Sequence, residues 1–220
     1  MTTATTVLLD LDGTLIDPKP GIIGSVQYAL RQMGKDAPPT EALTWAIGPP
    51  LRSTFTKLLG EPHAEEAVAH YRKNYADGAM FDCEVYAGIP ETLAALAQSG
   101  HRLIVVTAKP HVFARPIVSR LGLETFVSAV YGPELDGTRD NKADLLGHVL
   151  QAERIAPAAA VMVGDRQFDM LAAAANAVTG IGVTWGYGTR DELETAGART
   201  LCEAPPDLVA AVRGYQNEPA

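Results

Sequence analysis

Cysteine is scarce in this chain, which has only Cys83 and Cys202 among its 220 residues. The two cysteines lie far apart in the sequence and do not form the closely spaced pairs that hold structural metal ions. A disulfide scaffold and a cysteine-ligated zinc site are therefore not expected. Two reduced thiols in a cytoplasmic protein are the simplest interpretation.

Long apolar runs and clusters of basic residues are also missing. No stretch approaches the roughly 20 apolar residues needed to cross a bilayer, and the polar, uncharged segment 1–6 does not predict a signal peptide. Eighteen basic side chains against 26 acidic ones give a net charge of −8, which is a poor match for nucleic acid or an anionic membrane. We expect neither as a partner. An anionic substrate would need a locally positive site, which a metal ion can provide.

What the chain does contain is a regular series of short aliphatic runs. Most are continuous rather than alternating, as in strands that are covered on both faces of a parallel sheet. Segments with helical character follow the later ones, at residues 112–121, 142–153 and 168–175. This alternation predicts an α/β fold with a Rossmann-like doubly wound parallel sheet core. The expected strands are residues 5–9, 103–106, 128–131, 160–163 and 180–183.

The region from residue 18 to residue 87 has a different pattern. Residues 21–33 carry an apolar stripe at helical spacing, and residues 51–59 and 64–79 also favour helices. Little in this region resembles a strand. We therefore expect a catalytic core made of residues 1–17 and 88–220, with a helical cap domain, 18–87, inserted after the first strand.

Polar residues that can take part in catalysis follow the expected strands. In open α/β sheets, ligands bind beyond the carboxyl ends of the strands, so these side chains should gather at one edge. Paired carboxylates, a lysine and a hydroxyl suit phosphoryl transfer, because they can supply a nucleophile, a proton donor and charge neutralisation. Carboxylates also hold Mg²⁺, which offsets their repulsion of a phosphate. The residues are Asp10, Asp12, Thr107, Lys142, Asp165 and Asp169.

The order of these motifs resembles the haloacid dehalogenase-like hydrolase superfamily. The segment from Asp10 to Thr14 reads DLDGT, and Thr107, Lys142 and the GDRQFD segment 164–169 follow in the family's order. The resemblance spans nearly the whole chain. The helical insertion, the stretch 132–139 and the tail 182–188 are similar to the branch that contains phosphoglycolate phosphatases and 5′-nucleotidases.

The resemblance implies a role for each matching residue. Asp10 is expected to be the nucleophile and a Mg²⁺ ligand. Asp12 is expected to be the general acid and base and to give the metal its backbone carbonyl. Thr107 and the N–H of Ala108 are expected to bind the phosphoryl group, and Lys142 to neutralise it. Asp165 is expected to ligate Mg²⁺, and Asp169 to ligate it or orient a ligating water.

Some assignments keep alternatives. Many relatives have proline after the lysine, whereas Ala143 follows Lys142, so Arg139 and Lys109 are the other candidates for this role. Lys109 and Arg166 flank the motifs and either touch the substrate or face solvent. Arg52, in a segment that resembles a substrate-facing cap loop, is a candidate for substrate specificity.

The resulting expectation is a phosphatase that uses Mg²⁺ and an aspartyl-phosphate to hydrolyse a small phosphorylated metabolite, as a monomer or homodimer. A phosphomutase on the same scaffold and a non-catalytic phosphate-binding protein are the alternatives. A metal-free dehalogenase is disfavoured, since that chemistry does not need the second acid, Asp12. The sequence does not identify the substrate among phosphoglycolate, nucleotides, sugar phosphates and pyrophosphate.

Overall fold

The computed structural model describes residues 5–216. Residues 1–4 and 217–220 lie outside this range, including most of the polar segment 1–6 for which no signal peptide is predicted. The chain divides into two compact units, one formed by Met1–Ile16 with Val85–Ala220 and the other by Asp17–Glu84. We call them the core unit and the helical unit. Among residues 5–216, no helix is both long enough and apolar enough to cross a membrane.

The core unit is built on a six-stranded parallel sheet with the strand order β5-β4-β1-β6-β7-β8. All five expected strands match the observed strands within one residue at each end, whereas the edge strand β8 was not predicted. The continuous apolar runs are explained by burial, since every residue of β1 and β6 is buried. The strands are β1 (Thr6–Leu9), β4 (Arg102–Val106), β5 (Ala129–Tyr131), β6 (Ala160–Gly164), β7 (Thr179–Val183) and β8 (Thr200–Cys202).

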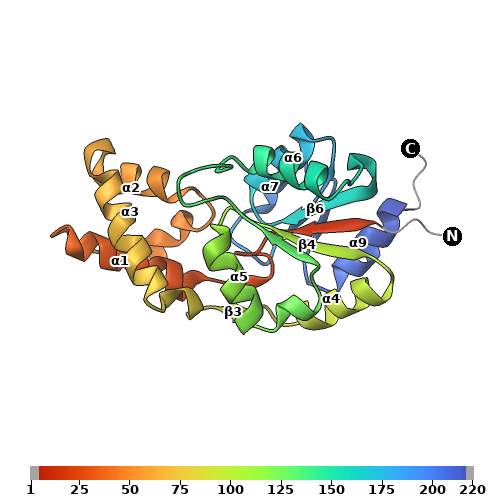
Figure 1. The fold of residues 1–220 in the computed structure, drawn as a ribbon, viewed down its shortest axis with the longest axis horizontal. Coiled ribbons are helices and arrows are strands. Elements are labelled where there is room, and N and C mark those ends of the chain that lie inside the picture. Colours follow the sequence, from red (N-terminus) through yellow and green to blue (C-terminus); the bar gives the residue numbers. More distant parts are fainter. Residues whose placement is uncertain (1–4, 217–220) are drawn as a thin grey trace. The chain divides into compact units, whose positions relative to one another are not determined.

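Helices cover both faces of this sheet. The chain moves from β1 through β4 to β5 in one direction and then from β6 through β7 to β8 in the other. Right-handed crossovers therefore place the two sets of connecting helices on opposite faces, and Figure 1 shows α4 and α5 on one side and α6 and α7 on the other. The predicted Rossmann-like doubly wound fold is confirmed. The helices are α4 (Ile89–Gln98), α5 (His111–Arg120), α6 (Lys142–Ala152), α7 (Gln167–Ala175), α8 (Arg190–Thr195) and α9 (Asp207–Gln216).

One face of the sheet is covered by a cluster of buried apolar side chains. Strand residues Leu8, Ile104 and Met162 meet Leu146 and Val149 of α6 and the alanines of α7 in this cluster. Each of the large side chains contributes about 1.5–3 kcal/mol by leaving water. This packing fixes the strand ends, and with them the loops that carry the polar motifs.

The helical unit contains three α-helices and two 3₁₀ turns. Helix α1 (Lys19–Gln32) buries the predicted stripe, and it packs on α3 (Glu61–Ala76), which also contacts α2 (Leu51–Leu59). Phe55 of α2 meets Tyr71 of α3 edge to face at 6.2 Å between ring centroids. The turns are η1 (Thr40–Ala46) and η2 (Ala79–Phe81), and two short paired strands, β2 (Ile16–Asp17) and β3 (Glu84–Val85), flank the segment. Two further 3₁₀ turns, η3 (Leu123–Thr125) and η4 (Pro157–Ala159), belong to the core unit.

Candidate active site

The carboxyl ends of three adjacent strands bring the polar motifs together. Strand β1 lies between β4 and β6, and its last residue, Leu9, is in register with Val105 and Val163. The residues that follow are therefore neighbours at one edge of the sheet, and the N–H of Asp10 donates to the carbonyl of Val163 at 2.9 Å. The connections from β1 and β6 leave in opposite directions, so this edge is the topological switch point where α/β folds bind ligands.

Three carboxylates form a buried cluster at this edge. Asp10, Asp165 and Asp169 each offer an oxygen within 4.8 Å of the others, and Asp165 and Asp169 are almost fully excluded from solvent. Burial, followed by repulsion from Asp169 and Asp10, raises the pKa of Asp165 well above its usual value. Burial also raises the pKa of Asp169. Such crowding of like charges is costly unless cations compensate it.

Lys142 supplies one of these cations. It is the first residue of α6, whose N-terminus is capped by the Asn141 side chain. Its Nζ lies 2.9 Å from Asp10 Oδ1 and also forms an ion pair with Asp169. Burial alone would lower the pKa of Lys142, but attraction to Asp10 and Asp169 outweighs burial and raises it. The lysine is therefore charged at neutral pH.

The other two candidates for this lysine's role have different partners. Arg139 pairs with Glu134 at 2.8 Å, and Lys109 pairs with Asp12 at 2.7 Å. Lys142, which the sequence favours for this role, forms an ion pair with Asp10.

The contact between Lys109 and Asp12 was not foreseen. Both side chains are mostly buried, with 5% and 13% of their surface exposed. Burial raises the pKa of Asp12, and the Lys109 ammonium opposes this rise. The available signal was positional, since Lys109 lies three residues beyond Val106, the last residue of β4, the strand next to β1. The sequence left Lys109 undecided between substrate and solvent, and neither alternative included Asp12.

Thr107 and Ala108 lie directly beyond β4. Thr107 is buried, and its Oγ1 accepts the N–H of Lys109 at 3.2 Å. Because a hydroxyl also has one hydrogen to donate, Thr107 still has a donor for an incoming anion. Ala108 is exposed, which suits a residue that contributes only its backbone.

A glycine-rich loop, residues 184–189, wraps around Asp165. The N–H of Tyr187 donates to Asp165 Oδ2 at 2.7 Å, and Trp185 Nε1 donates to the carbonyl of Thr14 at 3.0 Å. A Cβ on Gly186 would lie 2.3 Å from the carbonyl oxygen of Gly13, so the loop can approach this closely only without a side chain there. The stretch was noted in the sequence for its family resemblance, but its contact with Asp165 was not predicted.

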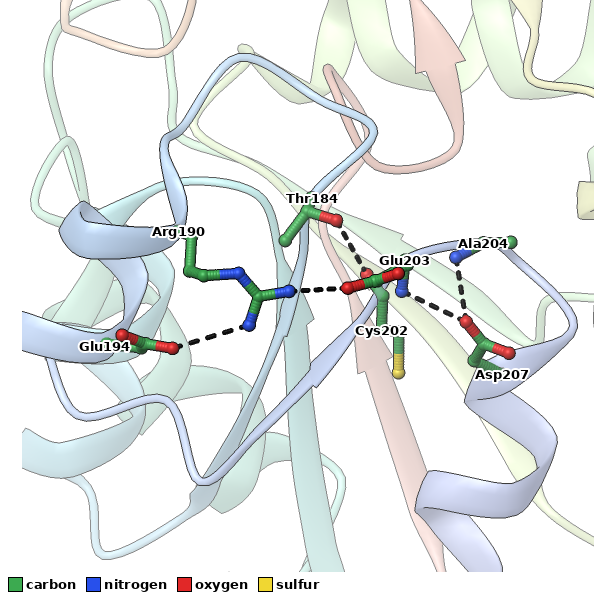
Figure 2. A network of polar contacts seen from close by, with 7 residues as sticks. All are labelled: Thr184, Arg190, Glu194, Cys202, Glu203, Ala204 and Asp207. Atoms are coloured by element: carbon green, nitrogen blue, oxygen red, sulfur yellow. Dashed lines mark hydrogen bonds and ion pairs between the residues drawn. The ribbon is translucent and has the colours of Figure 1, made fainter.

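Polar contacts anchor both ends of this loop (Figure 2). Thr184 Oγ1 donates to the carbonyl of Cys202 at 3.2 Å, and Arg190 bonds Glu203 at 2.6 Å and Glu194 at 3.4 Å. The Asp207 carboxylate accepts the N–H groups of Glu203 and Ala204 at the start of α9. The loop over Asp165 is thereby tied to β8 and its flanking helices.

Replacing Gly188 by alanine is expected to destabilise the core unit. The added Cβ would lie 1.9 Å from the carbonyl oxygen of Asp165, so the backbone must shift, and overpacking of this kind costs about 1–3 kcal/mol. We expect the melting temperature to fall by about 2–4 °C per kcal/mol lost. The control is Gly214→Ala, because nothing lies within 4 Å of a Cβ at that helical position. Equal melting temperatures for the two variants would show that the close approach at Gly188 is unimportant.

The site's charge and oxygen atoms fit a divalent cation. When all four are ionised, the carboxylates of Asp10, Asp12, Asp165 and Asp169 outnumber the ammonium groups of Lys109 and Lys142 by two negative charges. Within residues 5–216, Asp165 Oδ1 is buried without a hydrogen-bond partner. Oxygen ligands of this kind are those that Mg²⁺ prefers. Asp169 is less open to a metal, since Lys142 and the N–H of Arg166 already engage its oxygens.

Arg52, the candidate for specificity, lies at the start of α2 in the helical unit. Its guanidinium pairs with Glu61 at 2.7 Å and Glu65 at 2.5 Å, and 59% of the side chain remains exposed. These exposed pairs contribute little to stability. Its role in specificity stays a prediction.

Known proteins resemble this chain along most of its length. The chain is 46% identical over 189 residues to a 5′-nucleotidase of Pseudomonas aeruginosa, covering 85% of this chain and 86% of that protein. It is 37% identical over 199 residues to the tyrosine-protein kinase PtkA of Mycobacterium tuberculosis, covering 90% of this chain and 68% of the kinase. A crystal structure of a predicted phosphatase from Clostridium acetobutylicum superposes with a TM-score of 0.92 at 34% identity, covering 96% of this chain and 99% of that one.

The family profile described as Haloacid dehalogenase-like hydrolase matches residues 7–183. This range includes every motif residue at the sheet edge, from Asp10 to Asp169, as well as the whole helical unit. The chain belongs to the haloacid dehalogenase-like hydrolase family.

Proposed function

We propose that this chain is a Mg²⁺-dependent phosphatase that hydrolyses a small phosphomonoester through an aspartyl-phosphate on Asp10. The observation that carries the proposal is the pairing of Asp10 with the Lys142 ammonium at 2.9 Å, inside a cluster with Asp165 and Asp169 whose carboxylate oxygens lie within 4.8 Å of one another. A carboxylate held in this way is oriented for attack on phosphorus. The second carboxylate, Asp12, lies two residues further along the same loop.

The reaction follows in two balanced halves. A carboxylate oxygen of Asp10 attacks phosphorus, the bond to the leaving oxygen breaks, and Asp12 donates its proton to that oxygen. Asp12, now ionised, takes a proton from a water whose oxygen attacks the same phosphorus. The bond between phosphorus and Asp10 then breaks, which releases phosphate and restores both side chains.

The surrounding residues bind the phosphoryl group and balance its charge. Lys142 neutralises Asp10 and the phosphoryl oxygens, while the Thr107 hydroxyl and the N–H of Ala108 donate to them. The carboxylates of Asp10 and Asp165 and the backbone carbonyl of Asp12 would hold Mg²⁺. When bound, this ion supplies the positive charge that reduces repulsion between Asp10 and the phosphate. Asp169 holds the Lys142 ammonium, and it would ligate the metal or orient a ligating water, since its carboxylate oxygen lies within 4.8 Å of those of Asp10 and Asp165.

The names of the relatives decide which substrates we would test first. Because the chain is 46% identical to a 5′-nucleotidase, nucleoside 5′-monophosphates come first, followed by phosphoglycolate and sugar phosphates. In this proposal the helical unit is a cap domain that selects among them, with Arg52 as one of its specificity residues.

The test is phosphate release from p-nitrophenyl phosphate and from a panel of phosphorylated metabolites. We expect hydrolysis with Mg²⁺, loss of hydrolysis on adding EDTA, and recovery when Mg²⁺ is restored in excess. The proposal is wrong if folded protein hydrolyses none of these compounds with Mg²⁺ present, or hydrolyses them equally well in EDTA.

Transfer to an acceptor other than water is the second candidate, because one relative is named a tyrosine-protein kinase. The same aspartyl-phosphate would then pass its phosphoryl group to a hydroxyl. Incubation with ATP and a tyrosine-containing peptide tests the kinase form, and incubation with a hexose phosphate tests the mutase form. Faster formation of phosphopeptide or isomerised sugar than of free phosphate would favour transfer over hydrolysis.

A further inference from the structure

The proposed roles of the site residues do not explain why Lys109 forms an ion pair with Asp12. Lys109 Nζ lies 2.7 Å from Asp12 Oδ1, and 5% of the lysine side chain is exposed. Burying a lysine is costly, and a buried ion pair on average adds little net stability. The arrangement is thus better explained by what it does to Asp12 than by a contribution to folding.

The backbone holds Lys109 in a fixed position. It follows β4, the neighbour of β1, so it stands beside the loop that carries Asp12. Its N–H donates to Thr107 Oγ1 at 3.2 Å. On its other side, a Cβ at Gly132 would lie 2.2 Å from the Lys109 carbonyl oxygen, so the two segments are in close contact. Helix α5 begins two residues later, after Pro110. A lysine on such a rigid segment can fix the position of its partner.

Each of the two buried lysines of the site forms an ion pair with a carboxylate that has a role in the proposed reaction. Lys142 contacts Asp10 and Asp169, whereas Lys109 contacts Asp12. The nucleophile is thus paired with the Lys142 ammonium, and the proton-exchanging carboxyl with the Lys109 ammonium. An ammonium bound at Oδ1 disfavours a proton on that oxygen, because the two positive hydrogens would repel each other. The proton that Asp12 exchanges is therefore directed to Oδ2.

We propose that Lys109 is a positioning residue that holds Asp12 through Oδ1, so that Oδ2 exchanges protons with the leaving oxygen and with water. This inference rests on the proposed phosphatase function. It differs from a role in phosphate binding, in which the ammonium would act on the phosphoryl oxygens. Substrates with different leaving groups distinguish positioning of Asp12 from phosphate binding, because only a poor leaving group needs a proton from Asp12.

The experiment compares two substrates that share a phosphoryl group. The leaving group of ethyl phosphate is ethoxide, which needs a proton as it departs. The leaving group of dinitrophenyl phosphate is a stable phenolate, which does not. For Lys109→Met we expect kcat/KM to fall by roughly 10- to 100-fold with ethyl phosphate, a part of what general acid catalysis supplies. With dinitrophenyl phosphate we expect a fall of less than about threefold. Lys109→Arg keeps the charge and should retain more activity on ethyl phosphate than Lys109→Met.

Two control variants make the comparison specific. Lys142→Met should lower kcat/KM for both substrates by similar factors, because Lys142 acts on Asp10 and the phosphoryl group. Adding Lys109→Met to Asp12→Asn should slow ethyl phosphate hydrolysis little further, since residues that act as a unit are not additive. Circular dichroism and thermal melting check that each variant is folded. If Lys109→Met does not fold, Lys109→Gln takes its place in the same comparison.

Equal losses on the two substrates in a folded Lys109 variant would overturn the inference and would instead place the ammonium on the phosphoryl group. Unchanged activity on both would overturn it as well. Failure of the phosphatase proposal itself looks different, because the unmodified protein would then hydrolyse neither substrate.

Discussion

The Asp10→Asn variant is expected to lose at least about 10⁴-fold in kcat, which is the scale of removing a nucleophile from a hydrolase. The asparagine amide has nearly the same shape as the carboxylate but cannot form a stable bond to phosphorus. It also withdraws a negative charge from the Lys142 ammonium, which lies 2.9 Å from Asp10 Oδ1. The measurement is phosphate release from p-nitrophenyl phosphate with saturating Mg²⁺.

The intermediate can be detected separately from turnover. Acid quenching during turnover should trap a phosphoryl group on the peptide that contains Asp10, and mass spectrometry should show that hydroxylamine removes it, as expected of an acyl phosphate. Asp10→Asn should carry no such adduct. Asp36→Asn, an exposed aspartate in the helical unit, makes the same chemical change and should behave as the unmodified chain. Comparable activity of folded Asp10→Asn and the unmodified chain would rule out the mechanism.

The sequence was sufficient to predict the central strands and to place the carboxylates that follow them at one edge of the sheet. Strand β1 is a run of four fully buried residues, and a motif after such a strand must lie at the sheet edge. The edge strand β8 was missed because Thr200 is exposed and Leu201 only partly buried, so no aliphatic run marks it. The turn η1 was missed as well, because its only buried residues are Leu43 and Ala46.

The contacts between motifs depend on register and on backbone atoms, which a sequence pattern does not show. Lys109 meets Asp12 because β4 lies next to β1 in parallel register, and Asp165 is bound by the N–H of Tyr187, a group that any residue except proline provides. Gly188 stands apart from other glycines only because the chain passes so close to Asp165 there. In the helical unit, Arg52 pairs with Glu61 and Glu65 across two helices, whose packing the sequence did not specify.

Replacing Asp165 by asparagine is expected to change stability and activity in opposite directions. Asp165 is fully buried, and burial with the nearby Asp169 and Asp10 raises its pKa well above the usual value. A carboxyl with a raised pKa destabilises the folded state at every pH above its unfolded-state value, because ionisation costs more in the fold than in the unfolded chain. Asparagine removes that charge and keeps an oxygen to accept the N–H of Tyr187.

Without metal, the Asp165→Asn variant should therefore melt several degrees above the unmodified chain at pH 8, since about 1 kcal/mol corresponds to ~2–4 °C at this size. The sign of the pKa shift fixes the pH dependence. In the unmodified chain, the free-energy cost of ionising Asp165 in the fold decreases as the pH falls toward the unfolded-state pKa. The difference in melting temperature between the two proteins should therefore be smaller at pH 5 than at pH 8. Asp191→Asn, an exposed aspartate of α8, serves as the control and should show neither effect.

Magnesium should reverse the order of stability. Binding to the native state alone raises the melting temperature, and this rise should appear in the unmodified chain and be absent in Asp165→Asn, which has lost a negatively charged ligand. The variant's phosphatase activity should fall at least about 100-fold, because even outer partners of metal ligands are worth 10- to 100-fold. If Mg²⁺ stabilises Asp165→Asn as much as it stabilises the unmodified chain, Asp165 is not a ligand. The buried carboxylates would then serve to position Lys142 rather than to bind a metal ion.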